Sequence, residues 1–253
     1  MSPASTGSTM FRQLLGQFGV LERPREPLVL LREGLCARLG LKTAIHVGAH
    51  YGEERDAYEA LGLTDVLWVE ASTHVYQELV ERLAKPTGHG TRHVAVNAFA
   101  SDKAGDEVVL RQFSNEGASS SIFAATDLFR QTWPQVSETG GSEEVGTDTL
   151  DHIALVNGFE KADLVAADVQ GAELLVLKGA TGLLAQAKAV IVEVSLQRFY
   201  DGGVLQPELR QFLRQHGFIE VRRPPNHGDQ LFLRKSLFGP LRRFSDSMWE
   251  ARR

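Results

Sequence analysis

Two short segments of the chain combine glycine with ionisable side chains, as ligand-binding loops do. In residues 45–52 an apolar run ends at Gly48, and a second glycine follows. In residues 167–173 the apolar run ends at Asp168, and Gly171 follows. Glycine permits a sharp turn and lets a ligand approach the backbone, while the free N–H groups of a following helix bind polar groups. We therefore expect a ligand to bind where these two segments meet.

Glu70 is a third residue with a chemical use at the end of an apolar run. It follows residues 66–69 and stands about 20 residues beyond Gly48, the offset at which an acidic side chain binds ribose hydroxyls in open α/β sheets. The glycine spacing differs from G-x-G-x-x-G, which disfavours a dinucleotide and suits a nucleoside without phosphates. Taken alone, Glu70 is also explained as a solvated strand end, and Asp168 as a helix N-cap.

The order of the predicted elements brings these residues together. The predicted strands are 43–47, 66–69, 93–98, 108–113, 164–167 and 190–194. The predicted helices are 75–83, 150–156, 174–184 and one around Leu209, and the segments 218–221 and 230–233 resemble a hairpin. This alternation is typical of an α/β fold with a mostly parallel sheet, whose strands share one carboxyl edge, and with one antiparallel edge.

The chain is long enough for one large domain with additions at both ends. It has 253 residues, of which 43% are hydrophobic, enough for a single sheet core. We expect an N-terminal helical extension at 1–40, a main domain at 41–235 and an amphipathic tail at 236–253. Within the domain, residues 114–146 lack periodicity. The aromatic residues of this insert are Phe123, Phe129 and Trp133. Such inserts are either lids over a site or variable surface loops, and both interpretations remain open.

Charge and composition argue against several classes of protein. The formal net charge of −5 and the isoelectric point near 5.9 disfavour binding to duplex nucleic acid. The single Cys36 excludes an internal disulfide and a cysteine zinc cluster. The sequence shows no export signal and no membrane-spanning stretch, so we expect a cytoplasmic protein without membrane contact. The helical spacing of apolar residues in the tail indicates packing on the domain itself or on a second copy, which leaves a homo-oligomer open.

Six segments of the sequence, read in order, resemble the FkbM-type methyltransferases. They are residues 47–52, 68–70, 96–102, 148–151, 168–180 and 192–195. The similarity extends over roughly 40–235, and 168–180 is its most specific part. The resemblance implies a Rossmann-like class I methyltransferase fold, with a mostly parallel seven-stranded sheet, an antiparallel edge hairpin and helices on both faces. It also implies that S-adenosylmethionine donates a methyl group to a hydroxyl of a sugar, polyketide or other small natural product.

The resemblance assigns several positions to the cofactor. It places Gly48, Ala49 and Gly52 beside the methionine and ribose, Glu70 at the ribose hydroxyls, and Asn97, Ala98 and Asp102 beside the adenine. Two further cofactor positions depart from the family pattern, because His46 and Ala71 stand where Asp and Pro are usual. Ala166 stands where many relatives have a lysine, so the resemblance leaves the catalytic mechanism open.

Catalytic and substrate positions follow from the same comparison and from side-chain chemistry. The resemblance places Asp168 opposite the transferable methyl, and a carboxylate at a dry strand end has a raised proton affinity, which makes it our first choice of base. His50 is the second choice, because histidine titrates nearest neutral pH. The resemblance places the acceptor, a small hydroxylated molecule, beside Glu193, Tyr200, Ser120 and Ser121.

Three alternatives remain at this level. Asp168, Glu173 and Glu193 could bind a divalent cation such as magnesium, although scattered acids are usually unpaired and we do not favour a metal. A nicotinamide-dependent oxidoreductase would use the same sheet edge, but it lacks support from the glycine spacing. A noncatalytic nucleoside-binding or scaffold protein would keep the fold without the reaction.

Overall fold

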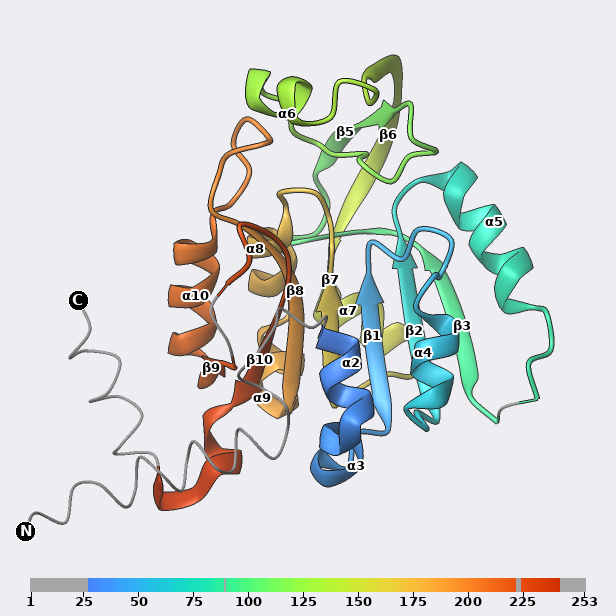
Figure 1. The fold of residues 1–253 in the computed structure, drawn as a ribbon. Helices are drawn as coiled ribbons and strands as arrows, with labels where there is room; N and C mark the ends of the chain where they lie inside the picture. The colour runs from blue at the N-terminus through green and yellow to red at the C-terminus, as the bar shows by residue number, and fades with distance from the viewer. Residues whose placement is uncertain (1–26, 89, 222–223, 242–253) are drawn as a thin grey trace, which may run out of the picture.

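The computed structural model describes residues 27–88, 90–221 and 224–241 of the chain. Its centre is a seven-stranded sheet with the order β3-β2-β1-β7-β8-β10-β9 (Figure 1). The strands are β1 Thr43–Val47, β2 Asp65–Glu70, β3 Arg92–Asn97, β7 Leu164–Ala167, β8 Ala189–Ser195, β9 Phe218–Glu220 and β10 His227–Arg234. Five strands are paired in parallel, whereas β10 runs against both β8 and β9. The predicted seven-stranded, mostly parallel sheet with an antiparallel edge hairpin is confirmed.

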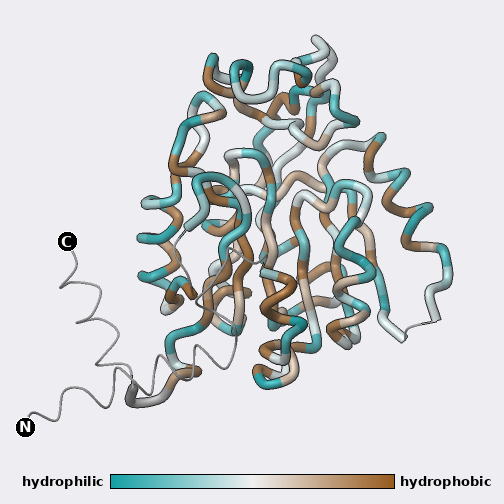
Figure 2. The backbone as a smooth tube through the Cα atoms, viewed as in Figure 1, coloured by the Kyte–Doolittle hydropathy of each residue, from teal (hydrophilic) through white to brown (hydrophobic). Residues whose placement is uncertain are grey.

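Both faces of the central strands are apolar, which explains their continuous hydrophobic sequences. Ile45 and Val165 face one core cluster, and Ala44 and Ala166 face the other. The first face is covered by α7 Leu150–Val156, α8 Glu173–Lys178, α9 Thr181–Gln186 and α10 Gln206–Gln215. The second face is covered by α4 Arg55–Ala60, α5 Thr73–Leu83 and helices that precede β1. In Figure 2 the hydrophobic segments accordingly concentrate along the strands between these layers.

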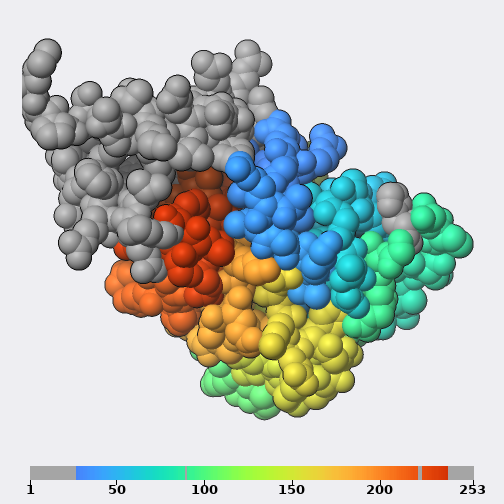
Figure 3. Space-filling view, turned by 90° about the horizontal axis from the view of Figure 1, so that it is seen from below, coloured from blue at the N-terminus to red at the C-terminus, as the bar shows by residue number. Residues whose placement is uncertain are grey.

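The helices before β1 pack on the sheet. They are α2 Pro27–Leu30, η1 Leu31–Leu35 and α3 Cys36–Leu39. Leu31 is fully buried in one cluster with Trp68 of β2 and Leu231 of β10. Seen from below in Figure 3, the blue segment that contains α2, η1 and α3 lies between the C-terminal elements and the α4 region. Residues 1–26 and 242–253, parts of the predicted extension and tail, lie outside the described residues; the tail begins with the short 3₁₀ helix η2 Lys235–Leu241.

The insert is more regular than the sequence indicated. A second sheet with the order β4-β6-β5 consists of β4 Phe99–Ser101, β5 Glu107–Phe113 and β6 Glu138–Thr149, and the insert also contains α6 Asp127–Thr132. The expectation that residues 114–146 lack regular structure is therefore wrong. β6 has almost no apolar alternation because most of it is exposed, and its backbone pairing with β5 defines it. In Figure 1 this sheet and α6 stand above the carboxyl ends of the central strands.

The predicted helix 174–184 is interrupted. It divides into α8 and α9 at Gly179, where an added Cβ would lie 1.9 Å from the carbonyl oxygen of Ser101. Gly179 also accepts a hydrogen bond from the backbone N–H of Asp151 through its own carbonyl. This close contact with β4 and α7 is long-range in sequence, so helical periodicity does not reveal it. No helix in the described ranges is long and apolar enough to span a membrane.

Candidate active site

The glycine loop after β1 is held against the ends of two neighbouring strands. The N–H of Gly48 donates to the carbonyl of Val69 at 2.9 Å. Gly48 has a φ of +77°, and an added Cβ would lie 1.7 Å from the carbonyl oxygen of Asp168. Gly52 has a φ of +72°, and its Cβ would meet Leu79 of α5 at 2.9 Å. The first glycine therefore brings β1 and β7 together at the site, and the second serves the packing of the loop on α5.

Glu70 points back toward this loop. Its Oε2 accepts the backbone N–H of His50 and its Oε1 accepts that of Ser72, both at 2.9 Å. Burial raises the pKa of Glu70, and these backbone hydrogen bonds oppose the shift. Each carboxylate oxygen has two lone pairs, so capacity remains to accept hydrogen bonds from a diol.

Two cavities meet at the ends of β1 and β7. The first contains about 590 Å³ of empty space and the second about 770 Å³. They share Gly48, His50, Ala118 and Asp168. The other predicted residues that line the first are Glu70, Ala71, Ala98, Ser120 and Ser121, and those that line the second are His46 and Ala49. The structure thus brings most of the predicted cofactor positions to one continuous edge.

Three predicted cofactor residues do not line either cavity. Gly52 packs on α5, as described above. The exposed Asn97 directs its amide to the carbonyls of Glu70 and Ala71, at 2.9 and 3.0 Å. The exposed Asp102 accepts a hydrogen bond from the hydroxyl of Ser101 at 3.3 Å. Asn97 supports the strand-end backbone and Asp102 faces solvent, so their adenine contacts stay a prediction.

The first cavity is also lined by residues that were not predicted from the sequence. Phe99, Leu110, Ala118 and Gln170 line the first cavity. Gln170 stands inside the conspicuous Asp-Val-Gln-Gly segment, which is a usable signal. Leu110 lies on β5 of the second sheet, and its sequence neighbourhood gives no sign of a site. Only the position of the insert above the central sheet brings it there.

In the second cavity, aromatic and apolar side chains surround His46. The Nδ1 of His46 lies 2.9 Å from the hydroxyl of Tyr58, and its ring stacks on Trp68 with the centroids 5.4 Å apart. Ala166 and Ile191 line the same cavity from β7 and β8. The position of the family lysine is thus occupied by a small apolar side chain.

Asp168 follows β7 and faces both cavities. Its backbone N–H donates to the carbonyl of Val47 at 3.0 Å, which continues the pairing of β7 with β1. Burial raises the pKa of Asp168 to about 7, the charges of Glu173 and Asp229 act in the same direction, and hydrogen bonds to Gln170 and Glu193 oppose the shift. A carboxyl group with this pKa changes its protonation state near neutral pH.

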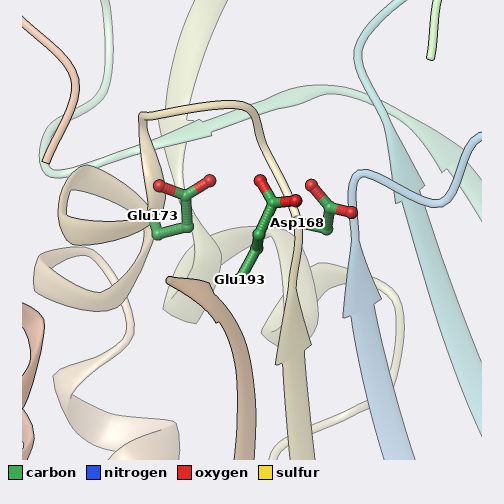
Figure 4. Close-up of side chains that lie close together, drawn as sticks. All are labelled: Asp168, Glu173 and Glu193. Atoms are coloured by element: carbon green, nitrogen blue, oxygen red, sulfur yellow. The ribbon is translucent and has the colours of Figure 1, made fainter. Parts of the chain in front are cut away.

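Asp168 belongs to a row of three carboxyl groups. In Figure 4 Glu193 of β8 lies between Asp168 and Glu173, the first residue of α8. Oxygen atoms of the three lie within 4.8 Å of one another. Glu173 Oε1 accepts two backbone N–H groups, and burial, followed by the charge of Asp168, raises the pKa of Glu193 well above its ordinary value. The spacing would accommodate one divalent cation, and a hydrogen bond also joins the carboxyl groups of Asp168 and Glu193.

His50, the second candidate base, is engaged at both ring nitrogens. Nδ1 lies 2.7 Å from Glu53 Oε1, and Nε2 lies 3.2 Å from the carbonyl oxygen of Glu116. Both partners are oxygen acceptors. The ring therefore ties the glycine loop to the insert, and the role of His50 as the second candidate base stays a prediction.

The serine cluster covers the first cavity. Ser121, only 1% exposed, donates its hydroxyl to the carbonyl of Gln170 at 2.7 Å. The hydroxyl of Tyr200 donates to the carbonyl oxygen of Ser119 at 3.2 Å. Tyr200 and Glu193 line a third cavity of about 340 Å³ behind Gly171, outside the first two. The insert therefore forms a roof over the strand ends.

The aromatic residues of the insert do not offer a free stacking surface. Phe129 is 2% exposed, and its ring lies 5.4 Å from that of Tyr200. The rings of Trp133 and Phe199 lie 4.7 Å apart, and Phe123 packs on the same cluster. These side chains belong to the small core that attaches the insert to the loop after β8.

Comparison with known proteins gives a family match. Residues 46–220 match the family described as the methyltransferase FkbM domain. A search of curated protein sequences gives no match.

Solved structures of similar fold include several methyltransferases. The magnesium protoporphyrin IX methyltransferase ChlM from Synechocystis PCC 6803, with bound SAM, has a TM-score of 0.41 and 13% identity, over 92% of this chain and 100% of that chain. A methyltransferase from Geobacter sulfurreducens has a TM-score of 0.44 and 13% identity, over 92% of each chain. The ribosomal protein L11 methylase from Lactobacillus delbrueckii subsp. bulgaricus has a TM-score of 0.42 and 15% identity, over 84% of this chain and 81% of that chain.

Proposed function

The chain belongs to the methyltransferase FkbM domain family, and we propose that it methylates a hydroxyl group of a sugar, polyketide or other small natural product with S-adenosylmethionine as donor. The observation that carries the hydroxyl assignment is Asp168, a carboxyl group with a pKa of about 7 at the junction of two cavities. An alcohol must lose its proton as the new bond to carbon forms, and a group that titrates near neutral pH is suited to accept that proton.

The residues of the two cavities fit S-adenosylmethionine. The Glu70 carboxylate has free lone pairs for the ribose hydroxyls. The apolar side chains of Ala98, Phe99 and Leu110 offer a surface for a purine ring. Gly48 packs directly on the backbone carbonyl of Asp168, and the side chain of Asp168, once ionised, would attract a sulfonium.

In the proposed methyl transfer, S-adenosylmethionine supplies the methyl group and residues of the chain handle the proton and the acceptor. When bound, S-adenosylmethionine supplies a methyl group on a cationic sulfur, so that the acceptor oxygen gains the methyl and S-adenosylhomocysteine remains. Asp168 accepts the proton that the acceptor hydroxyl loses. Ser120 and Ser121 of the roof line the same cavity and exclude bulk water from it. Glu193 and Tyr200, in the adjoining third cavity, are the proposed acceptor side of the site.

The alternatives differ in what they bind. A nicotinamide enzyme would need a loop that admits a pyrophosphate, and the glycine pattern at Gly48 and Gly52 lacks the required spacing. A noncatalytic nucleoside-binding protein would bind S-adenosylhomocysteine without transferring a methyl group. Calorimetry with S-adenosylhomocysteine and with NAD, followed by labelled methyl transfer to a panel of hydroxylated sugars and polyketides, separates the three functions.

We expect S-adenosylhomocysteine to bind, NAD not to bind, and label to appear on an acceptor oxygen.

Asp168→Asn should lower kcat by about 10²–10⁴-fold while the affinity for S-adenosylhomocysteine is retained. Glu70→Gln should instead weaken that affinity by about tenfold or more, because the ribose loses a charged acceptor. Full turnover by Asp168→Asn, or label on nitrogen or carbon instead of oxygen, would contradict the proposal.

A further inference from the structure

Gln170 connects the proposed base with the roof of the site. Its Nε2 donates to Asp168 Oδ1 at 2.6 Å and lies 3.4 Å from Glu193 Oε2. Its Oε1 accepts the hydroxyl hydrogen of Tyr200 at 2.7 Å, and its backbone carbonyl accepts that of Ser121. Both ends of one amide are thus used, one toward the carboxyl groups and the other toward the insert.

The chemistry of its partners fixes the orientation of this amide. The two carboxyl groups need a donor, so the NH₂ end faces Asp168 and Glu193. Burial raises the pKa of the Tyr200 hydroxyl, which keeps its proton and donates it to the oxygen end. The reversed amide would place its oxygen against the oxygens of Asp168 and Glu193. One orientation therefore satisfies every partner.

The backbone of Gln170 is also in a conformation that few residues other than glycine adopt. Its φ is +53°, in the left-handed region. This conformation is strained for a residue with a side chain, and such strain collects at functional sites. The turn between Asp168 and Gly171 directs the Gln170 side chain into the cavity wall instead of away from it.

We propose that Gln170 is a positioning residue for methyl transfer, whose amide holds the carboxyl group of Asp168 in one orientation and links it through Tyr200 to the covering insert. The proposal rests on the proposed role of Asp168. Because the amide donates to a carboxylate oxygen, it favours the ionised form of Asp168, the form that accepts a proton. The Tyr200 hydroxyl contacts both this amide and the Ser119 carbonyl of the insert, so covering the site and orienting Asp168 are coupled.

The ionisation of Asp168 can be followed without knowledge of the acceptor. S-adenosylmethionine carries a positive sulfur and S-adenosylhomocysteine a neutral one, so a carboxylate beside the sulfur favours the former. The ratio of their two affinities, measured by calorimetry on the full chain from pH 5.5 to 9, should rise through a midpoint near neutrality. Glu173, Glu193 and Asp229 also face Asp168, so Asp168→Asn should reduce the rise and move its midpoint without removing every dependence on pH. An unchanged rise and midpoint in that variant would contradict the role of Asp168 in the proposed function.

If Asp168→Asn behaves as expected, Gln170 is tested by the same measurement. Gln170→Leu should move the midpoint upward by about one to two pH units, the effect of losing one hydrogen bond to a charged group. Gln170→Asn should act in the same direction, because asparagine adopts the left-handed backbone readily but is one methylene too short to join its partners. Tyr200→Phe should produce a smaller upward shift, since the amide keeps its carboxyl partners but loses its anchor.

Gln206→Leu is the matched control. Gln206 is also buried, 5% exposed, and its amide donates to Gln230, away from the site. The same chemical change there should leave the midpoint in place. Superimposable curves for the wild type and for both Gln170 variants, each verified as folded by circular dichroism, would overturn the proposal and leave the role of Asp168 intact.

Discussion

At the scale of single residues, the site depends on one contact between backbones. Gly48 and Asp168 come from loops more than a hundred residues apart in sequence, and no atom fits between the Cα of the first and the carbonyl of the second. The three non-glycine residues with positive φ in the described ranges are His50, Glu116 and Gln170. His50 and Gln170 line the first cavity, and the carbonyl of Glu116 contacts the His50 ring. Backbone strain therefore surrounds the ligand-binding edge.

Gly48→Ala should destabilise the protein and weaken binding of S-adenosylhomocysteine. The added methyl would displace the carbonyl of Asp168 in addition to the backbone strain of a positive φ, which alone costs about 1–3 kcal/mol. Gly62→Ala is the control, because Gly62 has a φ of +73° and nothing within 4 Å of its added Cβ. Urea denaturation and calorimetry should show a larger loss for Gly48→Ala, and equal losses would contradict the role of this contact.

At the scale of elements, the insert is held over the sheet by its own small core. Phe113 of β5 and Phe129 of α6 pack with Phe199 and Tyr200, which follow β8. Thr126 caps α6 through a hydrogen bond from the N–H of Phe129 to its hydroxyl. This cluster keeps the Tyr200 hydroxyl beside Gln170, so elements from two distant parts of the chain meet beside Asp168.

Phe129→Ala should lower the free energy of unfolding by about 3–5 kcal/mol, the usual cost of removing a buried phenyl ring. Leu155→Ala is the control, because Leu155 on α7 is 57% exposed and its loss should change stability by only about 0.5 kcal/mol. Urea denaturation measures both. We also expect Phe129→Ala to reduce turnover more than affinity for S-adenosylhomocysteine, since the roof loosens while the glycine loop and Glu70 remain. A stability change equal to that of the control would show that the insert is not anchored by this ring.

At the scale of the whole molecule, buried acids make stability depend on pH in two directions. Burial raises the pKa values of Glu70, Asp168, Glu173 and Glu193, so the folded state binds more protons than the unfolded state between the ordinary carboxyl value near 4 and about 7. Stability therefore falls as pH rises through this window. The pKa of Asp163, which bonds to Lys188, is lowered, and its contribution is lost as pH falls below the ordinary value.

The melting temperature should accordingly be highest near pH 5 and fall by several degrees toward pH 8, at about 2–4 °C for each kcal/mol. The double variant Asp168→Asn with Glu193→Gln should flatten this decline, because neither side chain can ionise. Asp163→Asn should lower the melting temperature at pH 5 and pH 8 alike and leave the decline unchanged. Scanning fluorimetry across this range is sufficient, and a wild-type melting temperature that rises from pH 5 to pH 8 would contradict the prediction.

Several parts of this protein follow from its sequence alone. Continuous apolar runs predict β1, β2, β7 and β8, because strands buried on both faces need no polar alternation. Parallel strands share one carboxyl edge, so the runs that end at Gly48, Glu70 and Asp168 bring those residues to one site. β6 escaped prediction because its order comes from pairing with β5, and the break at Gly179 escaped it because the contact is with β4.

The tertiary structure decided where the side chains around that site point. Asn97 and Asp102 stand at the expected strand end, yet one supports the backbone and the other faces solvent. His50 lies on the expected loop, but two acceptors from Glu53 and the insert occupy its ring. The amide of Gln170 gains its role from Tyr200, thirty residues away. Local sequence sets backbone direction and hydrophobic pattern, whereas hydrogen-bond partners are chosen by segments that meet only after the chain has folded.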